Sequence, residues 1–218
     1  MCGRYNIRPH AVAWLEGFGI ATDLLREVVP RYNVAPGQDL PVVRPGETEP
    51  ELTGMRWGFV PHWMRDPNPR ARPINARAET AMDKPFFRDA MQNSHCLIPA
   101  TGFYEWQGSK GSRKQPWHIH RKDGDPFFMA GLWSEWTRSP EGPMNTFAIL
   151  TTDANKLMTP IHERMPVILS PEEAFDWLAG NQGVSLNPCP SKELEAEHIS
   201  TRVNNPTNDD EDVLSPID

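Results

Sequence analysis

The sequence predicts an α+β fold: a single domain over residues 1–218, built on a curved, mostly antiparallel sheet or open barrel with short peripheral helices. Three observations predict it. Segments rich in β-branched and aromatic residues outnumber helical patterns. The 23 prolines are roughly twice the average usage, which favours turns and strand edges over long helices. No internal repeat and no linker divides the chain.

Two segments carry clear helical patterns. From His10 to Gly19, apolar residues recur on one face of a short helix. Ser170 precedes Pro171 and stands three residues before Glu173, which is the capping-box pattern of a helix start, and Gly180 ends that helix. Weaker patterns predict helices over residues 79–91, 153–158 and 192–197.

Strand patterns dominate the remainder. The polar segment GSKGSRKQ, residues 108–115, lies between two aromatic-rich strands and predicts a hairpin loop. The predicted strands cover residues 40–44, 52–60, 95–99, 102–107, 116–121, 127–136, 145–151, 165–169 and 198–203.

The composition excludes some classes of protein. No run of about 20 apolar residues is present, which excludes a membrane-spanning helix, and the start MCGRYNIRPH lacks a secretory signal pattern. The three cysteines form no CxxC pair and are odd in number, which argues against a disulfide framework. We therefore expect a cytoplasmic protein, associated with the nucleoid if it is bacterial.

Charge alone does not decide the partner. The net charge is −7, which opposes nucleic-acid binding. Residues 204–218 contribute −5 of it, so the rest of the chain carries only −2 and can hold a basic groove. We expect this acidic end to be a partly flexible tail over its last residues.

Reactive groups stand two residues from arginines in strand-like segments, where alternate side chains share a face. This pattern suggests an anionic ligand beside reactive chemistry, although polar pairs at this spacing are also common on exposed strands. The pairs are Cys2 with Arg4, Asn75 with Arg77, and His162 with Arg164.

Cys2 is the sharpest of these features. Removal of Met1 is expected because the next side chain is small. The mature chain would then begin with an amine and a thiol on adjacent carbons, which can condense with an aldehyde to an imine and close a five-membered thiazolidine. A small buried residue at a strand start is the structural alternative, and position alone does not separate the two.

Glu105 and His162 are the candidate proton carriers. Glu105 lies in the aromatic strand GFYEW and shares a face with Phe103, where a carboxylate would lose hydration and suit proton exchange. An exposed strand glutamate is the alternative. His162 is the natural second carrier, with a structural histidine bonded to backbone as its alternative.

Other candidates are weaker. His118 and His120 share a face and could bind a metal, but no third ligand stands at a telling spacing; the packing interpretation is favoured, and we predict no metal and no cofactor. Trp63 follows Pro61 and His62 in a loop and could stack on a base or pack. Trp106 is placed in the cleft.

Ten segments together resemble the SRAP family, the SOS-response-associated peptidase domain proteins, whose members link covalently to abasic sites in single-stranded DNA. Any one segment is a weak string, but ten in family order over nearly the whole chain are highly specific. They are MCGR (1–4), RYNVAPG (31–37), MRWGFVPHW (55–63), INARAET (74–80), LIPATGFYEW (97–106), QPWHIH (115–120), MAGLW (129–133), FAILTTDAN (147–155), IHERMPVIL (161–169) and VNN (203–205).

The resemblance implies roles residue by residue. Cys2 matches the covalent nucleophile, Asn75 the residue that orients it, and Glu105 and His162 the acid–base pair. Three arginines match positions that hold DNA phosphates: Arg4, Arg77 and Arg164. Four further residues fall in motifs that line the DNA cleft: Asn33, Pro36, Trp63 and Trp106. It also implies a mixed fold with a curved sheet around a DNA cleft, and order in part of the acidic end.

We further expect a monomer whose partner is single-stranded DNA with abasic sites, extending to single-strand/double-strand junctions, with no membrane partner. Our hypothesis is that ring closure by the thiol yields a thiazolidine that shields the lesion, and that a lyase-like reversal passes through Glu105. We interpret the family's peptidase activity chiefly as removal of Met1.

Three alternatives remain from the residues. An N-terminal-nucleophile amidohydrolase also starts Met-Cys-Gly, but its glutamine-binding motifs are missing and the downstream segments stay unexplained. A non-catalytic single-strand DNA-binding module would bind reversibly, with a salt dependence and no preference for abasic sites. A thiol peptidase using Cys2 and His162 would cleave peptides in trans.

Overall fold

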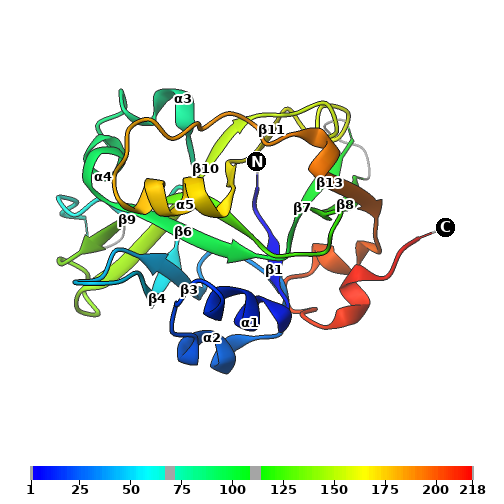
Figure 1. Cartoon of the computed structure of the whole chain (residues 1–218), viewed down its shortest axis with the longest axis horizontal. Helices are drawn as coiled ribbons and strands as arrows, with labels where there is room; N and C mark the ends of the chain where they lie inside the picture. The colour runs from blue at the N-terminus through cyan, green and yellow to red at the C-terminus, as the bar shows by residue number, and fades with distance from the viewer. Residues whose placement is uncertain (1, 67–71, 109–113, 218) are drawn as a thin grey trace.

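The computed structural model describes residues 2–66, 72–108 and 114–217 and contains two sheets with short helices around them (Figure 1). The strands are β1 (Tyr5–Ile7), β2 (Arg31–Val34), β3 (Asp39–Arg44), β4 (Glu51–Trp57), β5 (Asn75–Arg77), β6 (His95–Ala100), β7 (Gly102–Gln107), β8 (Gln115–Arg121), β9 (Phe127–Trp136), β10 (Met144–Asp153), β11 (Arg164–Pro166), β12 (Ile168–Leu169) and β13 (Leu194–His198). The helices are α1 (His10–Glu16), α2 (Asp23–Val28), α3 (Ala78–Ala81), α4 (Arg88–Asn93) and α5 (Pro171–Leu178), with 3-10 turns η1 (Ser191–Glu193), η2 (Thr201–Asn204) and η3 (Glu211–Leu214).

The larger sheet closes on itself. Its order is β11-β10-β4-β3-β6-β9-β12, and β10 also pairs with β9. The strands β10, β4, β3, β6 and β9 therefore form a closed five-stranded barrel that is mostly antiparallel. Within the described parts of this sheet, the parallel pairings are those of β10 with β4 and with the short strand β5. Closure removes exposed strand edges. The predicted α+β class with a curved antiparallel sheet and peripheral helices is confirmed.

The second sheet has the order β13-β8-β7-β1-β2, and its two faces are covered differently. Phe103 of β7 belongs to the main hydrophobic core. Its neighbour Tyr104 belongs to a second cluster with Ile199, Val203 and Val213 from the end of the chain. The predicted strand 102–107 is confirmed, and Gln107 pairs with Gln115 as a hairpin requires; residues 109–113 of the predicted loop lie outside the described residues.

The two strongest helix predictions are confirmed. α5 begins with the predicted capping box between Ser170 and Glu173, and it packs on β6 and β9 across the barrel (Figure 1). The barrel residue His95 holds it there, because its ring stacks on Trp177 at 3.7 Å and contacts the Trp177 carbonyl.

Three weaker helix predictions are wrong in part or whole. Residues 79–91 form two short helices separated by a turn that contains Pro85, since proline disfavours the helical conformation before it. Residues 153–158 form no helix: Asp153 ends β10, and residues 156–158 form a turn in which Asn155 Oδ1 accepts the backbone N–H groups of Leu157 and Met158. Residues 194–198 are strand β13, since pairing with β8 overrides the helical pattern.

Other boundaries also differ from the predictions. The predicted strand 52–60 ends at Trp57, where Gly58 takes φ 141°. The predicted strand 165–169 is two short strands, β11 and β12. The predicted strand 198–203 is wrong, because η2 lies there and packs Val203 on Tyr104. The sequence does not predict β1, β2, β5 or α2 as separate elements. Each is too short for its apolar residues to show a helical or strand periodicity.

The acidic end of the chain packs against the second sheet, on the right of the molecule beside β8 and β13 (Figure 1). Val213 is fully buried. The Asp209 carboxylate accepts the backbone N–H groups of Tyr32 and Asn33, both at 2.6 Å, and pairs with Arg31 at 2.5 Å. These contacts hold part of the acidic segment in place. Among the described residues no helix is long and apolar enough to cross a membrane.

Candidate active site

Cys2 lies three residues before the start of β1 and beside β7. The Tyr104 N–H donates to the Arg4 carbonyl at 3.0 Å, which extends the β1–β7 pairing toward Cys2 and brings it alongside Glu105. The Cys2 side chain is fully buried in the main core, and its Sγ lies 3.8 Å from the Arg4 carbonyl. Burial, and secondarily the negative charge of Glu105, raise the pKa of the Cys2 thiol well above its ordinary value. The thiol is therefore protonated at neutral pH.

The predicted shared face of Cys2 and Arg4 is wrong. Cys2 packs with the main core, whereas Arg4 contacts Val203 of the second cluster. Regular strand alternation begins only at Tyr5, so the two-residue rule does not apply to the segment before it.

Glu105 is the more deeply buried of the two predicted acid–base residues, Glu105 and His162. It is 3% exposed, and on β7 it stands on the same side as Phe103 and Gln107, as alternation predicts. Gln107 donates to the Pro160 carbonyl at 2.8 Å, which ties this strand to the loop that ends in His162. The fold therefore brings Cys2, Glu105 and the His162 loop to one end of β7.

His162 is half-buried, and its Nδ1 accepts the Arg164 N–H at 3.0 Å. The same Nδ1 lies 3.1 Å from the Arg164 carbonyl. These backbone contacts match the structural alternative that the sequence leaves open for His162, and they hold its ring beside the start of β11.

Asn75 begins β5, which pairs with β10 through Ile149. Its Nδ2 donates to the Ile74 carbonyl at 3.0 Å, and its buried Oδ1 has no hydrogen-bond partner among the described residues. The same Ile74 carbonyl accepts from Trp57, whose ring packs edge-on against Tyr5 of β1 at 5.3 Å. Because an unsatisfied buried acceptor is costly, Asn75 Oδ1 is suited to receive an N–H group.

The arginines predicted to bind phosphates differ in accessibility. Arg77 is exposed. Arg164 is 5% exposed and pairs with Asp153 at 2.6 Å and with Glu79 at 2.8 Å. Burial opposes the charge of Arg164, but the bonds to Glu79 and Asp153 outweigh it and raise its pKa. The placement of Arg164 favours a role in holding β11 and α3 to β10 over contact with a phosphate.

Arg4, Asn33 and Trp106 contact the VNN segment at residues 203–205. Arg4 donates to Asn33 Oδ1 and to the Val203 carbonyl, both at 2.8 Å, and its guanidinium lies 6.0 Å from the centre of the Trp106 ring. Trp106 in turn donates to Asn204 Oδ1 at 2.6 Å. Burial lowers the pKa of Arg4. These contacts couple the end of the chain to the strand that follows Cys2.

Asn33 is fully buried, so it does not present a side chain to a cleft in this structure. Its Nδ2 faces the carbonyls of Val203, Asn205 and Asn208 at 3.1, 3.0 and 2.8 Å. Sequence reasoning missed this role because the partners are about 170 residues away. Asn33 instead holds the segment against which Arg4 and Trp106 pack.

Replacing Asn33 by alanine should destabilise the protein by about 2–4 kcal/mol, because buried partners, one of them a guanidinium, lose their bonds. Thermal unfolding followed by circular dichroism should show a Tm lowered by about 5–10 °C. Asn93→Ala is the matched control, since Asn93 is exposed and bonds only to Asp89 at 3.2 Å. Equal Tm values for the two variants would contradict the structural role of Asn33.

Trp63 and Pro36 are both exposed. Trp63 is 45% exposed and is one of two large apolar side chains exposed to that degree among the described residues, the other being Ile217. Its ring meets Phe86 edge-on at 6.3 Å. Phe86 also borders a shallow apolar hollow of about 390 Å³ with Phe87. An exposed indole held at one edge suits stacking on a base.

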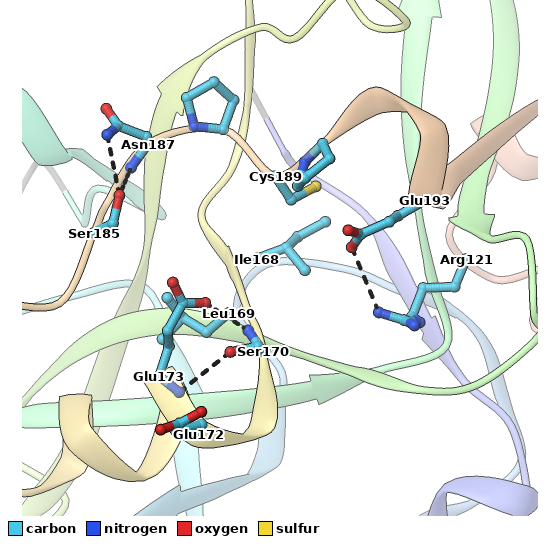
Figure 2. Close-up of a pocket in the computed structure, with 12 residues that line it drawn as sticks. Arg121, Ile168, Leu169, Ser170, Glu172, Glu173, Ser185, Asn187, Cys189 and Glu193 are labelled. Carbon is cyan, nitrogen blue, oxygen red and sulfur yellow. Dashed lines mark hydrogen bonds and ion pairs between the residues drawn. The ribbon is translucent and has the colours of Figure 1, made fainter.

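A hollow on another part of the surface contains none of the predicted site residues. It measures about 510 Å³ and lies between β12, α5 and the segment 185–193 (Figure 2). Its Arg121 lies 4.0 Å from Glu193 and also pairs with Asp123, so that cation is already neutralised. Cys2 and Glu105 are instead buried beside each other at the start of the chain, away from this hollow.

Comparisons with known proteins agree with the motif analysis. A family model described as SOS response associated peptidase (SRAP) matches residues 1–206. The chain is 37% identical over 222 residues to the abasic site processing protein YoqW of Bacillus subtilis, covering 98% of this chain and 99% of that protein. It is 31% identical over 234 residues to the abasic site processing protein YedK of Escherichia coli, covering all of both. A crystal structure of a protein from Bacteroides thetaiotaomicron matches with a TM-score of 0.84 at 28% identity, covering 99% of this chain and 100% of that one.

Proposed function

The chain belongs to the SRAP family, and from this premise we propose that it is an abasic site processing protein whose Cys2, after removal of Met1, links covalently to the aldehyde of an abasic site in single-stranded DNA. Relatives named for abasic site processing over their full length support the general function. The observation that carries the covalent step is the burial of Cys2 beside Glu105.

The chemistry follows from the two groups on the mature terminus. The amine nitrogen of Cys2 attacks the aldehyde carbon of the ring-opened sugar, and loss of water gives an imine. The thiol sulfur then adds to the imine carbon, and its proton ends on the nitrogen, which yields a neutral thiazolidine. Because burial keeps the thiol protonated, the amine acts first and the thiol closes the ring.

The surrounding residues move protons and orient the terminus. Glu105 accepts a proton from the attacking amine and returns one to the departing hydroxyl, and His162 assists opening of the sugar ring. Asn75 Oδ1 accepts an N–H of the new terminus, which satisfies the amide oxygen left without a bond among the described residues. Reversal of the crosslink runs through Glu105 in the opposite direction.

Denaturing electrophoresis tests the proposal. Purified protein is mixed with single-stranded DNA that contains one abasic site, and we expect a band that survives denaturation with the combined mass of protein and DNA. An oligonucleotide with an intact base at that position is the control. A salt-sensitive complex that forms equally with both oligonucleotides and disappears on denaturation would indicate a non-covalent binding module.

Removal of Met1 is part of the proposal, consistent with the family's peptidase description. Intact-mass measurement of the purified protein should therefore show a chain that lacks one methionine. A chain that keeps Met1 and still captures the lesion would contradict the mechanism, because the amine would then stand on the wrong residue.

Trp63→Ala should weaken DNA binding by about 1–3 kcal/mol, or roughly 5- to 150-fold in Kd, if the exposed indole stacks on a base. Fluorescence anisotropy with an intact single strand measures this affinity without the covalent step. Ile217→Ala is the matched control, since Ile217 is the other large exposed apolar residue, at 41%. Equal affinities of wild type and Trp63→Ala would assign Trp63 to packing on Phe86.

A further inference from the structure

A pair of histidines faces a pair of glutamates across the edge of the second sheet. His118 and His120 stand two apart on β8, and Glu195 and Glu197 stand two apart on β13. The register places Glu197 opposite His118 and Glu195 opposite His120, so all four side chains share one face. Sequence spacing gave no third ligand beside the histidines because β13 follows about 75 residues later and carries a helical pattern.

The side chains are close enough to share an ion. One ligand atom from each of His118, His120 and Glu197 lies within 4.8 Å of the other two. His120 Nε2 lies 3.6 Å from Glu197 Oε2, near the separation of about 3.3 Å between two ligands on a tetrahedral zinc ion. The two imidazole rings are stacked, with centroids 4.9 Å apart.

Neighbouring backbone fixes the orientation of one ring. His120 Nδ1 lies 2.9 Å from the Arg121 carbonyl, so it carries the proton and leaves the lone pair of Nε2 toward Glu197. A histidine that donates its second N–H to a backbone carbonyl is the usual arrangement of a metal ligand. The His118 side chain is buried, at 4% exposed.

We propose that His118, His120 and Glu197 form a binding site for a divalent transition metal of the zinc type, with Glu195 or water as a fourth ligand. Two imidazoles and a carboxylate are an established zinc ligand set. The bound ion joins β8 to β13, whose continuation leads to the VNN segment held by Arg4 and Trp106. A bound ion at this site would thus hold the end of the chain against the second sheet.

Two features set the affinity. Asn6 Nδ2 contacts His118 Nε2 at 3.0 Å and donates to the Tyr104 hydroxyl at 2.8 Å, and Asn6 Oδ1 accepts from the Thr101 hydroxyl at 2.5 Å. Metal binding at His118 Nδ1 therefore requires the ring proton to move to Nε2 and Asn6 to turn its amide oxygen toward it. The rearrangement at Asn6 opposes binding, whereas the carboxylates of Glu195 and Glu197 favour a cation. We therefore expect an exchangeable ion that a chelator removes.

Isothermal titration of the chelator-treated protein with zinc alone tests the site. We expect saturable binding of one ion, and a Tm raised by about 5 °C or more at zinc far above its Kd. His120→Gln and Glu197→Gln should each weaken binding at least tenfold. Both positions are partly or largely exposed, so these variants should fold, which circular dichroism without zinc checks. His62→Gln, an exposed histidine elsewhere, should bind zinc as wild type does.

The remaining outcomes overturn the site. Binding that persists unchanged in both His120→Gln and Glu197→Gln, or no saturable binding at all, would leave the four side chains as cross-strand charge pairs. Because thiolates also bind zinc, Cys2→Ser is titrated in parallel. Loss of binding in Cys2→Ser, with retention in the histidine variant, would place the ion at the start of the chain and refute the proposal.

Discussion

Cys2→Ser should abolish the denaturation-resistant crosslink to abasic single-stranded DNA. Serine keeps the amine at the mature terminus but replaces the sulfur, so an imine still forms while stable ring closure fails. The side chain is fully buried, and the change removes little volume, so we expect the variant to fold. The measurement is denaturing electrophoresis after incubation with one abasic oligonucleotide.

The same variant separates the two steps of the chemistry. Borohydride reduces an imine to a stable amine, so a reduced Cys2→Ser sample should recover a crosslinked band. Cys189→Ser is the matched control: Cys189 is only partly buried, with a pKa raised to about 12 chiefly by burial, and it borders the hollow in Figure 2. A heat-stable crosslink in unreduced Cys2→Ser would remove the thiazolidine from the mechanism.

The sequence predicts the elements whose hydrophobic periodicity extends over many consecutive residues. The ten-residue strands β9 and β10 were predicted nearly to their ends, and the capping box located α5. The three-residue strands β1 and β5 form because the longer strands β7 and β10 pair with them, and the four-residue strand β2 forms on β1. A segment that short has no period to detect, so tertiary pairing decides its state.

In the candidate site, too, local features were predictable from the sequence and contacts between distant segments were not. That Glu105 shares the face of Phe103 follows from alternation along one strand, and the structure agrees. The roles of Asn33 and Arg164 depend on partners far along the chain: Asn33 contacts the carbonyls of residues 203–208, and Arg164 pairs with Glu79. No local pattern reports such contacts, so motifs alone could not separate a buried, paired arginine from an exposed one such as Arg77.

Glu105→Gln should slow crosslink formation by roughly 100-fold or more, the usual contribution of a positioned proton carrier. The amide has nearly the volume of the carboxyl group, so folding should be preserved, but it neither accepts nor returns a proton near neutral pH. The measurement is the single-turnover rate of crosslink formation at saturating protein, followed across a pH series.

Glu105→Gln has two effects on the rate of crosslink formation, and they act in opposite directions, so the measured rate separates them. The negative charge of Glu105 contributes to the raised pKa of the Cys2 thiol, so its removal increases the thiolate fraction and, taken alone, speeds sulfur addition. A slower reaction therefore isolates the loss of proton transfer. Glu172→Gln, an exposed glutamate on α5, should react at the wild-type rate. An unchanged or faster rate for Glu105→Gln would show that the carboxylate acts only through its charge on the thiol.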